Sequence, residues 1–233
     1  MKLDINTILK NYVDFYTSQN KVYGLGDKYF YGVFDNHKQV VRRLIYVVDK
    51  ILPIIKKHPN LFKDKKVLDF GCGTGEHSYV LSHLCSSVDC YDPEPSHRSL
   101  LTSLFKNTNN FRILEETDCY YSFYNTVLLS GVLECVPNYT AWFDELTKKI
   151  NFEYVVLIFA PDEVRRVDGF SRHYRMYDNN EFQTTTNEDE LLNSIKHLSL
   201  VDRITFNTRE NRLDVIHNKT FNHKKIVHIY KNN

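Results

Sequence analysis

The sequence lacks an excess of either charge. Thirty lysines and arginines face 29 aspartates and glutamates over 233 residues, which gives a formal net charge of +1 at neutral pH. A protein that binds DNA or an anionic membrane by general electrostatic attraction carries a clear positive excess. We therefore expect neither DNA nor a membrane as a partner. Nothing in the sequence indicates the oligomeric state.

The sequence also lacks long apolar runs and paired cysteines. No segment approaches the roughly 18 apolar residues of a membrane span, and Asp4 interrupts the N-terminal segment where a signal peptide has its apolar core. The five cysteines form no Cys-x-x-Cys pair, and the histidines lack the spacing of a known metal-ligand set. We therefore expect no metal site and a cytoplasmic protein with reduced thiols.

Glycine is scarce, with eight residues in the chain, yet three of them alternate within "VLDFGCGTGEHS" at Gly71, Gly73 and Gly75. The dinucleotide fingerprint has the spacing G-x-G-x-x-G. Here Glu76 takes the place after Gly75, and a carboxylate in the first helical turn disfavours a pyrophosphate. No Gly-Lys-Ser/Thr follows either. The pattern indicates a cofactor without phosphates, with Asp69 supplying negative charge at the end of the preceding strand.

From residue 66 onward, apolar strands alternate with amphipathic helices. Strands are predicted at 66–70, 87–91, 111–114, 126–130 and 154–160, helices near 76–85, 96–107, 139–150 and 188–197, and two antiparallel strands within 198–231. Strands that are apolar throughout and separated by helices are typical of parallel sheets. We therefore expect an α/β fold, namely a doubly wound, mostly parallel, Rossmann-like sheet of seven strands with helices on both faces.

The N-terminal part has a different pattern. Residues 3–16 and 37–58 show helical spacing, and Pro53 is expected to kink or end the second helix. We expect residues 1–60 to form a helical lead that covers the active site, and residues 61–233 to form one compact domain.

Asp92 directly follows the second predicted strand, 21 positions after Gly71. In nucleoside sites, a carboxylate at about this spacing binds the ribose hydroxyls. The alternative is an aspartate that caps a turn or a helix before Pro93. The glycine loop upstream favours ribose binding.

Three segments, taken in order, resemble the motifs of the class I S-adenosylmethionine-dependent methyltransferases: "VLDFGCGTG", "VDCYDPEP" and "YNTVLLSGVLECVPN". Cys135 stands where the third motif commonly has histidine. The resemblance implies S-adenosyl-L-methionine as cofactor and S-adenosyl-L-homocysteine (SAH) as product. It also implies four groups of cofactor-binding residues: Asp69, Gly71, Cys72, Gly73 and Gly75 at the methionine part, Asp92 and Pro93 at the ribose, Asp118 and Cys119 at the adenine, and Ser130 and Gly131 near the sulfonium. For Asp118, an exposed loop position is an equal alternative.

Methyl transfer depends on holding the acceptor in line with the methyl group, and a hydroxyl acceptor benefits from a general base. After the fifth predicted strand, "FSRHYRMY" offers His173 as the base, with Arg172, Arg175 and Tyr177 for an anionic acceptor. A solvated basic loop explains this segment equally well. Tyr29, Tyr31 and His37 form a second candidate group that could close over the substrate, with packing under a loop as the alternative.

Together these features predict a methyltransferase that acts on a small molecule, with O-methylation of a sugar or of an anionic or phosphorylated metabolite as the favoured reaction. An Asp-Pro-Pro-Tyr signature for flipped bases is absent after the fourth predicted strand, which also disfavours DNA. Two alternatives stay open: a protein or RNA methyltransferase, and a non-catalytic module that binds S-adenosylmethionine.

Overall fold

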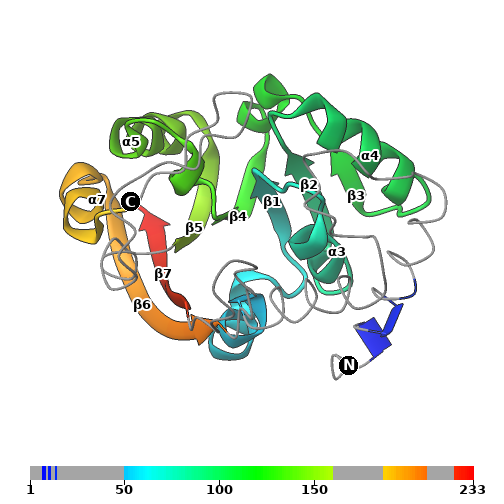
Figure 1. Ribbon diagram of the computed structural model, residues 1–233, viewed down its shortest axis with the longest axis horizontal. Coiled ribbons are helices and arrows are strands. Elements are labelled where there is room, and N and C mark those ends of the chain that lie inside the picture. Colours follow the sequence, from blue (N-terminus) through cyan, green and yellow to red (C-terminus); the bar gives the residue numbers. More distant parts are fainter. Residues whose placement is uncertain (1–6, 9, 12–13, 15–49, 160–185, 209–222) are drawn as a thin grey trace, which may run out of the picture.

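The computed structural model of the protein describes residues 7–8, 10–11, 14, 50–159, 186–208 and 223–233 (Figure 1). Its regular elements are β1 (Lys66–Phe70), α3 (Glu76–Ser82), β2 (Ser87–Tyr91), α4 (Pro95–Phe105), β3 (Phe111–Ile113), β4 (Phe123–Ser130), α5 (Tyr139–Lys149), β5 (Asn151–Phe159), α7 (Glu188–Ser194), β6 (Leu198–Thr208) and β7 (His223–Asn232). The connections contain the 3-10 helices η2 (Pro59–Leu61), η3 (Glu116–Tyr120) and η4 (Leu133–Cys135). Residues 50–57 are also helical.

The strands form one seven-stranded sheet in the order β3-β2-β1-β4-β5-β7-β6 (Figure 1). Strands β1 to β5 run parallel, whereas β7 is antiparallel to both β5 and β6. The chain moves outward from β1 to β3 and then returns to β4 on the other side of β1. In doubly wound sheets, ligands bind at such a reversal, beyond the carboxyl ends of the strands. The topology therefore places the candidate site where β1, β2 and β4 end.

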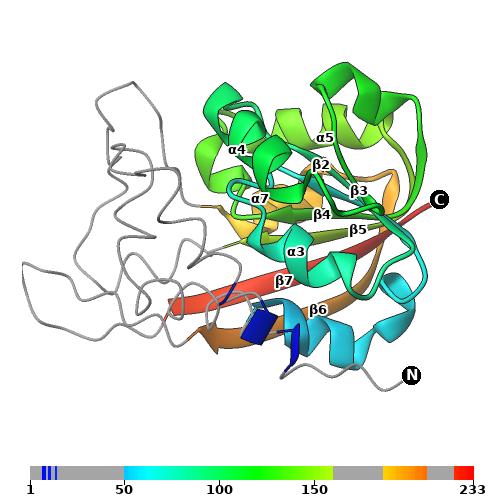
Figure 2. The same ribbon diagram turned by 90° about the vertical axis from the view of Figure 1, so that its right-hand side faces the viewer.

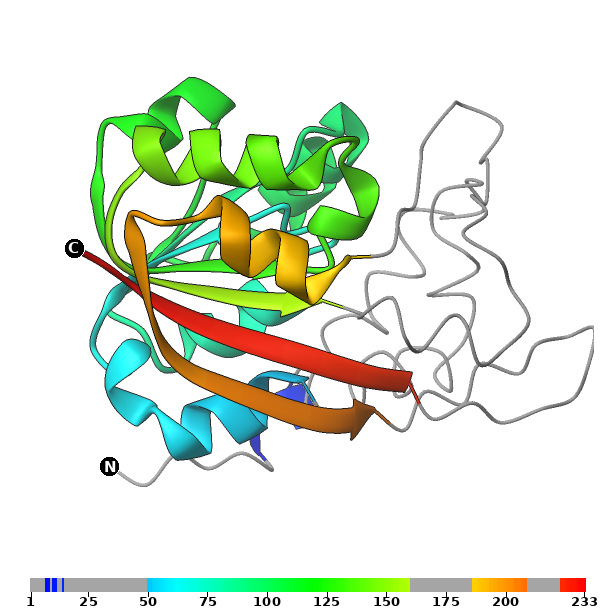
Figure 3. The same ribbon diagram turned by 90° about the vertical axis from the view of Figure 1, so that its left-hand side faces the viewer.

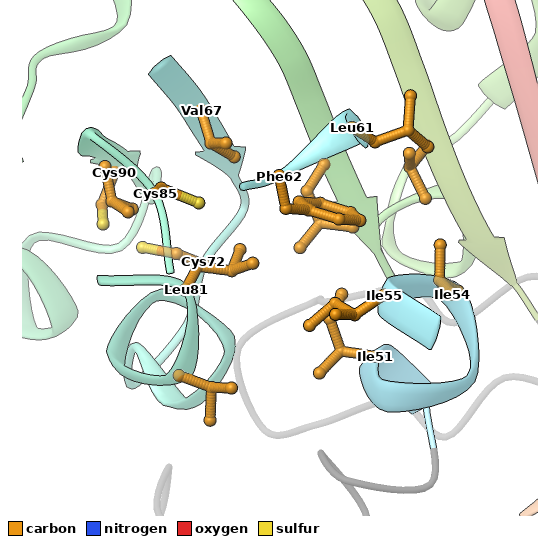
Figure 4. Close-up of a cluster of buried hydrophobic side chains, with 14 of the residues drawn as sticks. Ile51, Ile54, Ile55, Leu61, Phe62, Val67, Cys72, Leu81, Cys85 and Cys90 are labelled. Carbon is orange, nitrogen blue, oxygen red and sulfur yellow. The ribbon is translucent and has the colours of Figure 1, made fainter. Parts of the chain in front are cut away.

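Alternate residues of the strands pack on opposite faces of the sheet. Val67 belongs to a core cluster with residues of α3, α4 and the helix 50–57, whereas Leu68 belongs to a second cluster with residues of α5 and α7. Figures 2 and 3 show α5 on one side of the sheet and the helix 50–57 on the other. In Figure 4, Ile51 and Ile55 of that helix lie near Phe62 within the first cluster.

The structure confirms the predicted fold class, with helices on both faces and two antiparallel strands in the tail. Strands β4 and β5 each begin three residues earlier than predicted, at Phe123 and Asn151. Those two residues are paired with each other and exposed, and the buried Tyr124 and Phe152 follow them singly. The first residues of both strands therefore lack the continuous apolar run on which the prediction rested.

Pro53 was predicted to kink or end its helix. It does not end the helix, which continues to residue 57. Ile51, Ile54 and Ile55, on both sides of Pro53, are buried in the first core cluster. Their burial stabilises the helix against the loss of the proline N–H.

A polar network attaches α7 to the antiparallel end of the sheet. Arg203 Nη2 of β6 donates to Glu188 Oε2 at 2.7 Å, and His228 Nε2 of β7 lies 2.6 Å from Glu188 Oε1. His228 Nδ1 in turn lies 2.6 Å from the Tyr230 hydroxyl, and the His228 side chain is fully buried. The hydrogen bond from Arg203 lowers the pKa of Glu188 to about 2; burial opposes this shift and His228 adds to it.

We expect Glu188→Gln to lower the free energy of unfolding at pH 7. A carboxyl whose pKa is lowered by folding stabilises the folded state above its unfolded pKa and loses this effect as the pH falls through the folded value. The difference in the free energy of unfolding between the variant and the native protein should therefore become smaller as the pH falls from about 5 toward about 2. Urea unfolding over that pH range measures this free energy. Glu145→Gln, in the exposed pair with Lys149, is the control and should change little; an equal effect of both variants would contradict the prediction.

Candidate functional site

The glycine loop, residues 71–75, leaves the end of β1 and is attached to the end of β2. The backbone N–H groups of Gly71 and Cys72 both donate to the Tyr91 carbonyl, at 2.8 and 3.0 Å. The N–H of Gly73 donates to Asp92 Oδ2 at 2.7 Å. Asp92 directly follows β2, so the parallel pairing of β1 with β2 brings the loop and the carboxylate together.

The glycines of the loop and of the turn after β4 have left-handed backbones, and they serve two purposes. A Cβ on Gly71 would lie 2.6 Å from Val132 Cγ2, and one on Gly75 would lie 2.5 Å from Leu101 Cδ2. These two glycines allow the loop to pack against its neighbours. A Cβ on Gly73 or Gly131 would meet no atom of the described residues within 4 Å. Within that part of the chain, both positions leave space at the ends of β1 and β4 where a ligand can approach the backbone.

Three carboxylates are buried around the glycine loop: Asp69, Glu76 and Asp92. The Ser78 hydroxyl donates to Asp69 Oδ2, and the Thr74 hydroxyl donates to Glu76 Oε1 at 2.6 Å. Burial raises the pKa of Asp69 to about 7; the hydrogen bond from Ser78 opposes the shift, and the charges of Glu76 and Asp92 add to it. This concentration of negative charge disfavours a phosphate and favours a ligand with cationic groups.

Asp92 also caps the turn that follows it, because Glu94 N–H donates to Asp92 Oδ1 at 3.0 Å. The capping role that the sequence left open is thus present. It does not exclude ribose binding, because an ionised carboxylate accepts about four hydrogen bonds. Pro93, beside Asp92, is exposed.

Ser130 and Gly131 end β4 at the same edge of the sheet. Gly131 N–H donates to the Ile158 carbonyl of β5 at 2.9 Å, which fixes the turn. The Ser130 hydroxyl is buried, and among the residues that the structure describes it has no hydrogen-bond partner. A buried hydroxyl without a partner is costly, so this position favours a polar ligand group. Cys135 follows in η4, and its thiol lies 3.6 Å from the Gly131 carbonyl.

The two residues expected at the adenine, Asp118 and Cys119, lie in η3. Asp118 is exposed, whereas the Cys119 side chain is fully buried in the second core cluster. Of these two neighbours, Asp118 has the side chain that is free to reach a ligand. The Cys72 side chain is likewise buried in the first core cluster, so a ligand at the glycine loop would meet only the backbone of Cys72.

Several candidate residues from the sequence lie outside the described ranges: His173, Arg172, Arg175, Tyr177, Tyr29, Tyr31 and His37. The same holds for most of residues 1–60. In the described part of the chain, no three histidine, cysteine or acidic side chains are grouped so that they could hold a metal ion. Within that part, no helix has the length and apolar character required to cross a membrane.

Three residues near the site were not singled out from the sequence: Ser78, His97 and Arg98. Ser78 bonds Asp69, His97 Nδ1 lies 2.9 Å from Asp92 Oδ1, and Arg98 Nη1 donates to the Asp92 carbonyl at 2.7 Å. The sequence signal for the last two was Pro95, which favours the first turn of a helix and so brings the residues after it back over Asp92.

Comparisons with known proteins agree with this geometry. A family model described as "Methyltransferase domain" matches residues 37–207, which is most of the chain. A search of curated protein sequences finds no match. A SAM-dependent methyltransferase from Anabaena variabilis superposes with a TM-score of 0.62 at 11% identity, covering 99% of this chain and 96% of that chain. One from Methanosarcina mazei gives 0.56 at 15% identity, covering 77% and 97%.

A third similar structure is coclaurine N-methyltransferase bound to N-methylheliamine and SAH, with a TM-score of 0.54 at 14% identity, covering 78% of this chain and 71% of that chain. At such identities, structural likeness establishes the fold alone. The family match establishes more: the chain belongs to the methyltransferase-domain family, as a class I S-adenosylmethionine-dependent methyltransferase. It is an enzyme whose cofactor is S-adenosyl-L-methionine, as the motifs predicted.

We expect Asp69→Asn to stabilise the ligand-free protein at alkaline pH. A carboxyl whose pKa is raised by folding contributes stability below its unfolded pKa and loses it as the pH rises through the folded value. Between about pH 4 and pH 8, the native protein should therefore lose up to about 4 kcal/mol relative to the variant, from a shift of about three pKa units. Urea unfolding at both pH values measures this difference. A difference that does not change with pH would show that folding does not raise the pKa of Asp69.

Proposed function

We propose that the glycine loop, Asp92, Pro93, Asp118, Ser130 and Gly131 hold S-adenosylmethionine, and that the enzyme methylates an oxygen atom of a small molecule. The observation that carries the cofactor part is the convergence of Gly73, Asp92 and Gly131 at one edge of the sheet. Gly73 N–H donates to the Asp92 carboxylate at 2.7 Å, and none of the described residues would contact a Cβ placed on Gly73 or Gly131.

The residues present fit the cofactor chemically. When bound, S-adenosylmethionine supplies a methyl group activated by a sulfonium, and its amino group carries a second positive charge. The buried carboxylates Asp69, Glu76 and Asp92 favour such a cation. Asp92 offers an acceptor for ribose hydroxyls, and the buried Ser130 hydroxyl offers a polar partner near the end of β4. The chain's own role is to bind and orient the cofactor and the acceptor.

The acceptor part of the proposal is a sugar or an anionic or phosphorylated metabolite. The net charge of +1 supports a small molecule over a nucleic acid, and coclaurine N-methyltransferase shows the same fold with a small organic molecule bound. In this proposal His173 acts as the general base, with Arg172, Arg175 and Tyr177 at the anionic group and Tyr29, Tyr31 and His37 closing over the substrate. The proposed location is the cytoplasm, and the five cysteines, all in the described ranges, support it because none of them forms a disulfide.

We expect Asp92→Ala to weaken the binding of SAH about ten- to hundredfold, because a hydrogen bond to a charged group contributes about 1.5–3 kcal/mol. Isothermal titration calorimetry with the purified protein measures the dissociation constants. Glu145→Ala, which removes an exposed carboxylate from α5, should bind SAH as the native protein does. A folded native protein that binds neither SAH nor S-adenosylmethionine would contradict the proposal.

We expect His173→Ala to lower turnover at least about a hundredfold, the range that general-base catalysis contributes, while leaving the SAH affinity unchanged. SAH release from a panel of sugars, phosphorylated metabolites, amines, RNA and protein measures turnover. Release with RNA or protein alone would support the rival substrate classes. Cofactor binding without release from any acceptor would favour the non-catalytic alternative.

A further inference from the structure

The carboxylate of Asp92 is held by donors from three different parts of the chain. Gly73 N–H donates to Oδ2 at 2.7 Å, Glu94 N–H donates to Oδ1 at 3.0 Å, and His97 Nδ1 lies 2.9 Å from Oδ1. The first two come from backbone that flanks the strand ends. The third is a side chain from the first turn of α4, and it is not one of the residues by which the cofactor site was identified.

The placement of His97 follows from how α4 begins. The helix starts at Pro95, so residues 97 and 98 lie in its first turn and face back toward the end of β2. Arg98 strengthens this arrangement: its Nη1 donates to the carbonyls of Asp92 and Pro93, at 2.7 and 3.0 Å. Arg98 Nε also lies 3.4 Å from Glu115 Oε1, at the start of the segment that carries Asp118. One helical turn thus fixes both the backbone and the carboxylate of residue 92.

The charges around His97 explain why an imidazole suits this position. Asp92, Glu94 and Glu76 all face it, and their negative charges favour the imidazolium. Burial of the ring opposes that charge, but the hydrogen bond and charge of Asp92, with Glu94 and Glu76, outweigh it and raise the pKa of His97. A charged donor then holds the carboxylate more strongly than a neutral one.

We propose that His97 is a positioning residue for the ribose of the cofactor: it fixes the Asp92 carboxylate so that Oδ2 accepts a ribose hydroxyl. The inference rests on the proposed cofactor site. An ionised carboxylate has about four acceptor positions. Gly73, Glu94 and His97 use three of them among the described residues, two on Oδ1 and one on Oδ2. Rotation of the carboxylate would break these bonds, so the remaining position on Oδ2 has a defined direction before the cofactor arrives.

In the opposite role, His97 would compete with the ribose for Oδ1. The two roles predict changes of opposite sign when the imidazole is removed. If His97 positions Asp92, its removal lowers the affinity for the cofactor. If His97 competes, its removal raises that affinity.

The test is a double-mutant cycle between His97 and Asp92, with the SAH dissociation constant measured by titration calorimetry. We expect His97→Ala to weaken binding about five- to tenfold, the value of one hydrogen bond. His97→Asn should bind within about twofold of the native protein, because the asparagine amide nitrogen stands as many bonds from Cα as Nδ1 does. On the Asp92→Ala background, His97→Ala should have no further effect, because His97 acts through that carboxylate.

Two further variants keep the test decisive. His97→Phe retains a flat ring without a donor and should weaken binding as His97→Ala does, so it replaces the alanine variant if that one does not fold. His83→Ala removes a histidine from the other end of α3, where its ring packs against Tyr79, and should leave the affinity unchanged.

The outcomes separate this inference from the proposed function. If Asp92→Ala weakens binding but His97→Ala and His97→Phe bind as tightly as the native protein or more tightly, the inference is overturned and the cofactor site stands. An effect of His97→Ala that persists on the Asp92→Ala background also overturns it. If the folded native protein does not bind SAH, the proposed site itself fails.

Discussion

The hydrogen bond from Gly73 N–H to the Asp92 carboxylate joins two strand ends that the chain reaches 19 residues apart. It requires a left-handed backbone at Gly73, with φ of 56°, and a carboxylate directly after β2. Because the same loop also donates twice to the Tyr91 carbonyl, three hydrogen bonds join the ends of β1 and β2 into one unit. The packing of Gly71 against Val132 extends this unit to the turn after β4. The candidate cofactor site depends on this coupling of three strand ends.

Local sequence patterns were sufficient to predict the fold, because runs of apolar residues indicate which segments are buried. Strands such as β1 and β2 are almost wholly buried, so their apolar runs stand out from the amphipathic helices between them. The prediction was incomplete where the burial of a residue does not follow from the local sequence pattern. Exposed Phe123 begins β4, and the helix through Pro53 is held by isoleucines on both sides of the proline.

The sequence was sufficient to predict which backbone segments form the candidate site, but not all of the side chains that take part in it. Glycine spacing and strand order place Gly73, Asp92 and Gly131 together. The roles of His97 and Arg98 depend on the exact residue at which α4 begins, because a shift of one position would turn both side chains away from Asp92. Cys119 was predicted to bind the cofactor, but its side chain is buried in the core. Its neighbour Asp118 is exposed, and the sequence alone does not distinguish these two environments.

The cofactor and acceptor parts of the site differ in how general their chemistry is. Buried carboxylates around a glycine loop suit a nucleoside cofactor that has cationic groups and no phosphate. They therefore distinguish this kind of cofactor from a phosphorylated one. We expect other segments of the chain to select the acceptor, because one fold supports many functions through different sites. Family membership therefore identifies S-adenosyl-L-methionine as the methyl donor.

The distribution of the thiols has a practical consequence. Cys72, Cys85, Cys90 and Cys119 are buried, whereas Cys135 is exposed. Exposure decides which thiols a reagent reaches, so a bulky maleimide would modify the folded chain at this single position. The Cys135 thiol lies 3.6 Å from the carbonyl of Gly131, in the turn that follows β4. The native sequence therefore provides an attachment point for a fluorophore that would sense ligands at this edge of the sheet.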